Sequence, residues 1–176
     1  MAKCPICNTR KGKRKCLFQE NFICSLCCGE TRAAEKCGGC SYFVDTRSIR
    51  NYKKAPHYAL QRMSDDIQLQ SAADVIESAF CLFDTQLDGR PDDQFFKKIA
   101  ELLMDRYHFK DEKLDFADNL QKQGFEVIDR IIQKDLASLP PDEISRLLGT
   151  IYRSILRRAG KGRDYINFIQ EQMGFG

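Results

Sequence analysis

Eight cysteines stand within the first 40 residues of this 176-residue chain, and their spacing indicates metal binding. They are Cys4, Cys7, Cys16, Cys24, Cys27, Cys28, Cys37 and Cys40. A Cys-x-x-Cys step, as in Cys4/Cys7 or Cys37/Cys40, folds back sharply enough to offer two sulfurs to one ion. Zinc takes four sulfurs in a tetrahedron at about 2.3 Å. Because eight cysteines make two Cys4 sites with no ligand left over, we expect two zinc ions.

Disulfides and an iron–sulfur cluster are the alternatives to zinc. The chain starts Met1-Ala-Lys-Cys4 with no apolar stretch, so we expect no secretory signal and a cytoplasmic location. The reducing cytosol disfavours disulfides. A cluster would use the same soft thiolates, but the short gap between Cys28 and Cys37 does not match the long spacings of Cys-Cys-Gly cluster domains. Zinc is therefore the favoured metal.

The metal is expected to be structural. Residues 1–44 hold few large apolar side chains, and a segment with so small a core rarely folds unaided. Metal binding can supply folding free energy on the order of 10 kcal/mol per structural site. A Cys4 site is closed, whereas a catalytic zinc keeps one ligand position open. We therefore expect a head that unfolds when the metal is removed.

The eight ligands can be divided between two ions in two ways. Cys4, Cys7 and Cys24 share one site, and the fourth ligand is either Cys27 or Cys28; the 16-residue gap between Cys7 and Cys24 resembles that of treble-clef fingers. Neighbours on a helix point about 100° apart, so Cys27 and Cys28 do not easily serve one ion. The cysteine left over joins Cys16, Cys37 and Cys40. A helix is expected over residues 29–36.

The motif Cys24-Ser-Leu-Cys27-Cys28, followed by a short polar stretch and a final ligand pair, resembles the cross-brace zinc fingers of the MYND and HIT types. Those families interleave two zinc sites and often use a Cys-x3-Cys step, which Cys24 and Cys28 match. This chain departs from them at Cys16, which stands without a paired cysteine, and in a final pair without histidine. The resemblance implies protein docking, and it favours Cys28 as the fourth ligand of the first site.

The whole head also resembles an uncharacterised group of bacterial zinc-finger proteins, which brings no assigned activity. The residues that carry this resemblance are Cys4-Pro-Ile-Cys7, the basic stretch that runs up to Cys16, and the stretch from Ile23 to Arg32.

Positive charge is concentrated in the first part of the chain. Residues 1–62 hold 13 Lys and Arg against 4 Asp and Glu, although the whole chain carries only +3. Five basic residues lie between Cys7 and Cys16: Arg10, Lys11, Lys13, Arg14 and Lys15. Such a loop could grip the phosphates of a nucleic acid. It could equally offset two zinc–thiolate centres, each of charge about −2, and few aromatic residues stand nearby for base stacking.

No enzyme motif is present in the sequence. It contains no glycine-rich phosphate loop, no Gly-x-Ser-x-Gly and no His-Glu-x-x-His. Cys81 stands among apolar residues and is expected to be a buried thiol. His57 and His108 are expected to be surface or hydrogen-bonded histidines. We therefore expect no enzymatic activity.

The rest of the chain shows apolar residues at helical spacing. We expect a connector over residues 45–63 and a helical domain over 64–176, which makes the fold mainly α: a small double-zinc finger followed by a four- to five-helix bundle. Helices are expected from about Asp65, capped by Ser64, to Gln86; from Pro91 to Tyr107; over residues 112–139; from Asp142 to about Ile155; and over residues 164–173. Gly124 is expected to be a weak point of the third helix.

Together these patterns predict a zinc-binding, non-enzymatic adaptor that docks an unidentified protein partner through its head. A nucleic-acid-binding regulator that uses the Arg10–Lys15 loop is the alternative, and an iron–sulfur redox protein is a third reading. The longest apolar runs, such as Ala79 to Phe83, are far shorter than the ~20 residues of a membrane-spanning helix. No membrane association is therefore expected.

Overall fold

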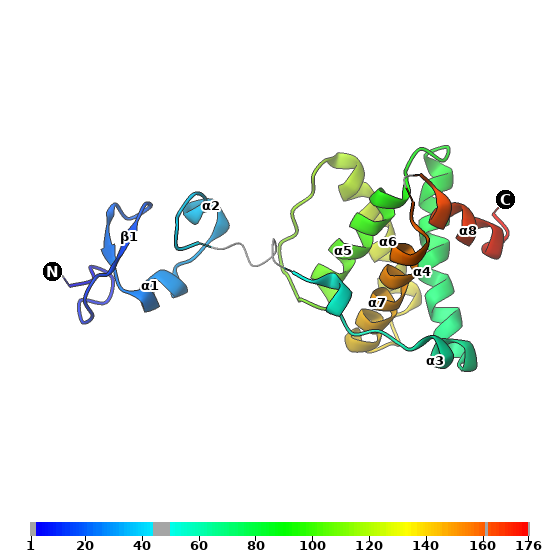
Figure 1. Cartoon of the computed structure of the whole chain (residues 1–176), viewed down its shortest axis with the longest axis horizontal. Coiled ribbons are helices and arrows are strands. Elements are labelled where there is room, and N and C mark those ends of the chain that lie inside the picture. Colours follow the sequence, from blue (N-terminus) through cyan, green and yellow to red (C-terminus); the bar gives the residue numbers. More distant parts are fainter. Residues whose placement is uncertain (1–2, 44–49, 161, 176) are drawn as a thin grey trace. The chain divides into compact units, whose positions relative to one another are not determined.

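A computed structural model describes residues 3–43, 50–160 and 162–175 of the chain. The chain divides into two compact units, residues 1–50 and residues 51–176 (Figure 1). The described residues are mainly helical, which confirms the predicted fold class at that level. Residues 51–63, assigned above to the connector, belong to the second unit, where Ala55 is only 4% exposed.

The first unit, called the head, is built from short elements. Strands β1 (Arg14–Cys16) and β2 (Asn21–Ile23) form an antiparallel hairpin, followed by helices α1 (Ser25–Glu30) and α2 (Ala34–Cys37). The prediction of one helix over residues 29–36 is wrong. Helix α1 ends because Thr31 donates both its backbone N–H and its hydroxyl to the carbonyl of Cys27, which closes the last turn.

The second unit, called the helical unit, begins with the short 3-10 turn η1 (Tyr52–Lys54) and the short helix α3 (Leu60–Asp65). Its longer helices are α4 (Ile67–Gln86), α5 (Asp93–Tyr107), α6 (Asn119–Asp135), α7 (Pro141–Arg158) and α8 (Asp164–Met173). The predicted cap of the first long helix is wrong. Asp66, not Ser64, caps α4 by accepting from the backbone N–H groups of Gln68 and Leu69.

Helix α6 begins seven residues later than predicted. Asp118 accepts from the backbone N–H of Gln121 at 2.7 Å and caps the helix, while the Gln121 side chain accepts from the N–H of Ala117. Residues 112–118 are not helical, yet Leu114 and Phe116 still pack against the core. Because these loop residues continue the apolar periodicity of the helix, the sequence pattern places the start of the helix too early.

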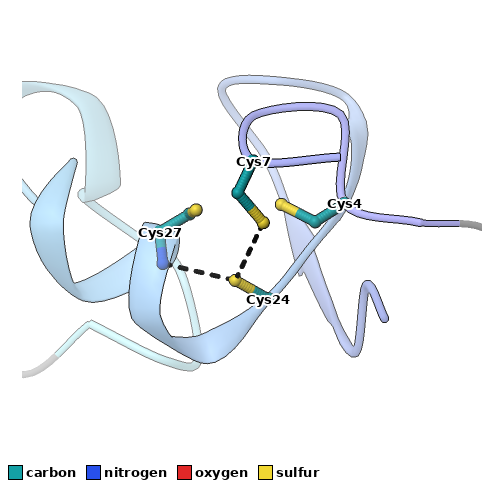
Figure 2. A group of neighbouring side chains, drawn as sticks. All are labelled: Cys4, Cys7, Cys24 and Cys27. Atoms are coloured by element: carbon teal, nitrogen blue, oxygen red, sulfur yellow. Dashed lines mark hydrogen bonds between the residues drawn. The ribbon is translucent and has the colours of Figure 1, made fainter. Parts of the chain in front are cut away.

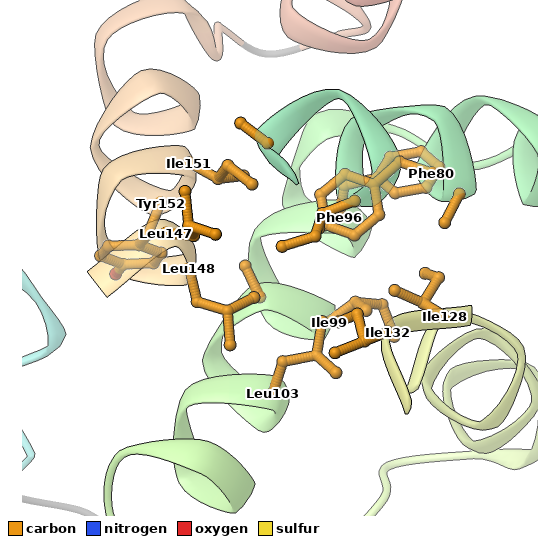
Figure 3. Close-up of a cluster of buried hydrophobic side chains, with 14 of the residues drawn as sticks. Phe80, Phe96, Ile99, Leu103, Ile128, Ile132, Leu147, Leu148, Ile151 and Tyr152 are labelled. Carbon is orange, nitrogen blue, oxygen red and sulfur yellow. The ribbon is translucent and has the colours of Figure 1, made fainter. Parts of the chain in front are cut away.

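Helices α4 to α8 share one hydrophobic core (Figure 3). Phe80, Phe96, Ile99, Ile128 and Ile132 are all fully buried in it. Gly124, expected to weaken α6, is where that helix meets its neighbours. A Cβ there would lie 3.0 Å from the Phe95 ring and 3.1 Å from the Phe83 ring. Glycine at this position therefore lowers the helix propensity of α6 but allows its neighbours to pack closely against it.

Tyrosine–carboxylate hydrogen bonds tie elements of the helical unit together. In each pair the phenol donates to a carboxylate on another element: Tyr52 to Asp105, Tyr107 to Asp129, Tyr152 to Glu101 and Tyr165 to Glu77, at 2.7–3.0 Å. Burying a phenol or a carboxylate is costly unless it has a hydrogen-bond partner. These pairs satisfy that requirement and fix which helices are neighbours.

Helix α8 is anchored by carboxylates of other helices. Asp93 accepts from the backbone N–H groups of Tyr165 and Ile166, in the first turn of α8. Arg163 donates to both carboxylate oxygens of Asp84, at 2.9 and 2.7 Å, and Asp84 is only 1% exposed. Gln170 also donates to Asp84. A helix of ten residues is thus held by buried polar contacts as well as by its apolar face.

Candidate metal centre

The first two cysteines lie on a tight turn. The backbone N–H of Cys4 donates to the carbonyl of Arg10 at 2.7 Å, and the N–H of Asn8 donates to the carbonyl of Cys4 at 2.8 Å. Asn8 adopts φ 53°, a left-handed conformation that asparagine tolerates. These bonds fold the chain back on itself directly after Cys7. Both sulfurs are therefore presented to the same side of the turn.

The other two cysteines come from the start of α1. Cys24 is the N-cap residue, and its sulfur accepts from the backbone N–H of Cys27 at 3.5 Å. The side chain of the third helical residue lies beside the cap, as in a capping box, so Cys24 and Cys27 converge. Cys28 is one residue further round the helix, where Arg14 donates to its sulfur at 3.6 Å. The grouping favoured from the sequence is thus wrong in one member: Cys27 joins the first group instead of Cys28.

Cys4, Cys7, Cys24 and Cys27 form a four-cysteine cluster whose sulfurs all lie within 4.8 Å of one another (Figure 2). The sulfurs of Cys7 and Cys24 are 3.9 Å apart. A tetrahedral zinc–thiolate site with bonds of about 2.3 Å requires sulfurs about 3.8 Å apart. Three of the four residues are at most 3% exposed. The donor type, spacing and burial therefore fit a closed site for a thiophilic ion.

The four thiols have opposing tendencies to ionise. The pKa of Cys7 is lowered to about 5 because the Thr9 hydroxyl and the backbone N–H groups of Arg10 and Thr9 stabilise its thiolate. Burial and the neighbouring sulfurs raise the pKa of Cys27 to about 12. Crowded sulfurs resist carrying several negative charges, and a divalent cation removes that resistance because it binds thiolates. Thr9 was not singled out from the sequence, although its position two residues after Cys7 offered a signal.

Two of the five predicted nucleic-acid-binding residues face the sulfurs. Arg10 donates to the Cys24 sulfur, which raises the pKa of the guanidinium, and Arg14 contacts Cys28. Lys11, Lys13 and Lys15 are exposed. The loop is therefore divided: its arginines contact the cysteines, and its lysines face solvent.

The remaining four cysteines form no comparable group within residues 3–43. Cys16 accepts from the backbone N–H of Gln19 at 3.4 Å, and both Cys16 and Cys28 pack against the four-cysteine cluster. Cys37 ends α2, and the N–H of Cys40 donates to the carbonyl of Cys37. The structure thus brings together one predicted set of four ligands and leaves Cys16, Cys28, Cys37 and Cys40 apart.

The other reactive residues named from the sequence have ordinary surroundings. Cys81 is fully buried on α4, and burial raises the pKa of its thiol to about 12. It is thus poorly suited to act as a nucleophile. A ring nitrogen of His57 lies 3.3 Å from the carbonyl oxygen of Ala55, and the His108 ring contacts Phe109 edge to face.

Comparisons with known proteins found no matching family model, no matching curated protein and no matching solved structure. Across the ranges that the structure describes, no helix is both long and apolar enough to cross a membrane.

Proposed function

We propose that the chain is a cytoplasmic, non-enzymatic adaptor whose head holds two structural zinc ions and docks a protein partner. The observation that carries this proposal is the four-cysteine cluster, in which four buried or half-buried thiols converge at the spacing of a tetrahedral site. A site filled by four thiolates leaves no position for a substrate or a reactive water. Its task is then to hold the head's surface in shape.

A second zinc ion would be held by Cys16, Cys28, Cys37 and Cys40. Two contacts support this set, because they bring the segment of Cys37 and Cys40 close to that of Cys16 and Cys28. Lys36 lies 5.0 Å above the Phe18 ring, and Arg14, which contacts Cys28, lies 5.2 Å from the Tyr42 ring. A modest closure of the α2 segment on metal binding would complete the site, since metal binding and folding are coupled in such small heads.

The head also exposes apolar side chains that suit a protein partner. They are Ile6, Leu17, Phe18, Phe22, Leu26 and Tyr42, each at least 40% exposed. Apolar side chains that face solvent gain free energy when a partner covers them. A metal-held scaffold would keep them in fixed positions, which lowers the entropy cost of docking.

Metal content tests the ion count. Protein purified without oxygen should contain two zinc ions per chain by elemental mass spectrometry. Cys27→Ser and Cys40→Ser should each lose at least one ion, whereas Cys81→Ala, which removes the cysteine outside the head, should keep both. A single ion in the unaltered chain that Cys40→Ser still keeps would remove the second site. Iron in the protein, together with an absorption band near roughly 400 nm, would show that the head holds an iron–sulfur cluster and not zinc.

Matched leucine variants test the docking role. Leu26 on α1 is 52% exposed and Leu82 on α4 is 45% exposed. With zinc-loaded protein as bait, cross-linking should identify a partner that Leu26→Ser loses and Leu82→Ser retains. Equal capture by both variants would place the partner's contact outside the head.

Nucleic-acid binding is the second candidate function, and one observation favours it. In the hairpin, Lys15 pairs with Phe22 across the strands, so a cation and an exposed aromatic ring share one face. Lys13, which directly precedes the strand, is also exposed. Cations that follow the backbone beside a ring on which a base can stack are typical of single-strand binding.

Salt dependence separates the two functions. If the hairpin binds single-stranded nucleic acid, affinity falls steeply as salt rises. The double variant Lys13→Gln/Lys15→Gln should then lower the slope of log affinity against log salt by about 1 to 2. Lys134→Gln, at an exposed position of α6, is the control. An oligonucleotide affinity that neither variant changes excludes this hairpin as the binding site.

A further inference from the structure

The segment before α3 lies against helix α7 and is fixed there by backbone contacts. Gly149 allows the approach: a Cβ at this position would lie 2.1 Å from the carbonyl oxygen of Pro56. Next to it, the backbone N–H of Tyr58 donates to the Thr150 hydroxyl at 2.9 Å. Ala55 is buried in the core at the same crossing. Figure 1 shows this segment in cyan and teal on its way past α7 to α3.

A pocket of about 440 Å³ opens where this segment crosses α7. It is lined by Lys53, His57, Tyr58, Ala59, Leu60, Thr150, Arg153, Leu156 and Arg157. The Arg153 guanidinium donates to the backbone carbonyl of Lys53 at 2.6 Å, which holds one wall to the other. A volume in this range is typical of small-molecule sites. The pocket is therefore shaped by contacts that do not depend on a ligand.

The charged residues that line this pocket are all cationic. Lys53, Arg153 and Arg157 line it, and no carboxylate does. In the part of the chain that the structure describes, none of these three makes an ion pair. Two other hollows of the helical unit differ, because one is lined by Asp65 and Asp66 and the other includes Asp74 and Asp135.

Helix capping alone does not explain these cations. Cations in the last turn of a helix interact favourably with its dipole, and Arg157 is in the last turn of α7. Arg153 lies before that turn, and Lys53 comes from a different segment. Their convergence on one pocket requires another reason.

The pocket also offers aliphatic surface. Ala59, Leu60 and Leu156 lie in its lining with the cations, and the Leu60 side chain is 62% exposed. Exposing a leucine to water is unfavourable by about 25 cal/mol for each Å², so a ligand that covers it gains affinity. Cations and aliphatic surface in one pocket match a molecule that carries both an anionic group and an apolar chain.

We propose that this pocket binds a small amphiphilic anion, with a phosphate or carboxylate head held by Arg153, Arg157 and Lys53 and an apolar chain laid against Leu60 and Leu156. Arginine binds such oxygens through paired N–H donors. The proposal concerns the helical unit alone and stands whether or not the head holds metal.

Calorimetric titration with monomeric octyl phosphate tests the proposal, and inorganic phosphate and octanol titrated separately test each half of the ligand. Octyl phosphate should bind at least about tenfold more tightly than either half, since the cations and the aliphatic side chains both contribute. The double variant Lys53→Gln/Arg157→Gln should weaken binding at least about tenfold through the loss of two charged contacts. Leu60→Ser should weaken octyl phosphate and leave inorganic phosphate unchanged. Arg130→Gln, at an exposed position of α6, carries the same type of charge loss outside the pocket and should bind as the unaltered chain does.

Several outcomes would overturn the proposal. One is that octyl phosphate, up to millimolar concentration, produces neither heat in the titration nor a shift of amide NMR signals. Another is that the chain binds inorganic phosphate and octyl phosphate with equal affinity. A third is that Arg130→Gln weakens the binding of octyl phosphate as much as the pocket variant does. Vesicles containing phosphatidylglycerol distinguish a lipid headgroup from a free ligand. Binding to vesicles without binding of monomeric octyl phosphate would mean that the chain contacts a membrane surface and does not bind a ligand in the pocket.

Discussion

The two units bury different kinds of interior. The head's buried cluster is Cys4, Ile23, Cys24 and Cys27, which is three sulfurs and a single aliphatic side chain. The helical unit buries a continuous apolar core (Figure 3). Tyrosine–carboxylate hydrogen bonds lie at its margins. One unit is organised around potential metal ligands, and the other around apolar area.

This difference indicates where the stability of each unit comes from. A single buried isoleucine supplies on the order of 2–3 kcal/mol, which is far too little to order the head, since each residue loses about 1–2 kcal/mol of backbone entropy. If the four-cysteine cluster holds a metal, as proposed, coordination would supply what apolar burial does not. The helical unit has no such need, so the two units should respond differently to the same perturbation.

Metal removal should produce the largest contrast. A strong chelator should unfold the head, because each structural site contributes on the order of 10 kcal/mol, while α4 to α8 stay folded. Amide NMR spectra should lose the dispersed signals of the head and keep those of the helical unit, and helical circular dichroism should fall only slightly. Collapse of the whole helical signal would show that the two units fold as one.

The same truncation in each unit sharpens the contrast. Ile99 and Ile23 are both at most 1% exposed. Ile99→Ala should lower the free energy of unfolding of the helical unit by about 2–5 kcal/mol without loss of metal. Ile23→Ala should weaken metal retention in competition with a chelator and leave the urea midpoint of the helical unit unchanged. Metal loss from Ile99→Ala would couple the two units.

The next largest predicted effect concerns the buried ion pair between Arg163 and Asp84 in the helical unit. Arg163→Met leaves Asp84, which is 1% exposed, with Gln170 as its remaining side-chain donor. We expect a loss of about 3 kcal/mol in the free energy of unfolding, measured by urea denaturation. Arg163→Met combined with Asp84→Asn removes both charges and should recover part of the loss. A double variant no more stable than Arg163→Met would assign the effect to packing of the arginine instead of its charge.

In the head, the sequence predicted that cysteines gather as potential metal ligands, and the structure brings four of the eight together. The sequence did not predict how the ligands are grouped, and zinc itself stays a prediction. The choice between Cys27 and Cys28 depends on where α1 begins, because only an N-cap at Cys24 turns Cys27 towards it. The resemblance to cross-brace fingers pointed to Cys28, where the local helix geometry selects Cys27.

In the helical unit, periodicity predicted the long helices and missed the contacts that join them. The range 164–173 matches α8, since its stripe and its flanking glycines are local signals. The crossing of Pro56 over Gly149 and the Tyr165–Glu77 bond join residues about 90 positions apart. Such pairings follow from tertiary packing, which no local pattern contains. The cationic pocket on α7 was missed for the same reason.

The smallest predicted effect concerns Glu77, which accepts a 2.7 Å hydrogen bond from Tyr165. Burial raises the pKa of this carboxyl, although the Tyr165 hydroxyl opposes the shift. A raised pKa means that the folded chain holds the proton more tightly than the unfolded chain does. Its contribution to stability is therefore complete below the unfolded pKa of about 4.3 and is lost as pH rises through the folded value.

Glu77→Gln removes this titration and keeps an oxygen that can accept from Tyr165. Its stability relative to the unaltered chain should improve between pH 4 and pH 8, by at most about 1.4 kcal/mol for each pH unit within the titration window. Urea denaturation across that pH range measures the difference, with Glu126→Gln at an exposed position of α6 as the flat control. A variant that instead loses stability relative to the unaltered chain as pH rises would mean that the charged form of Glu77 is the one Tyr165 stabilises. In that case Glu77 would be an ionised carboxylate in the interior of the helical unit, as Asp84 is in its salt bridge with Arg163, and the contrast between a metal-ligand interior and an apolar one would be smaller than the buried residues suggest.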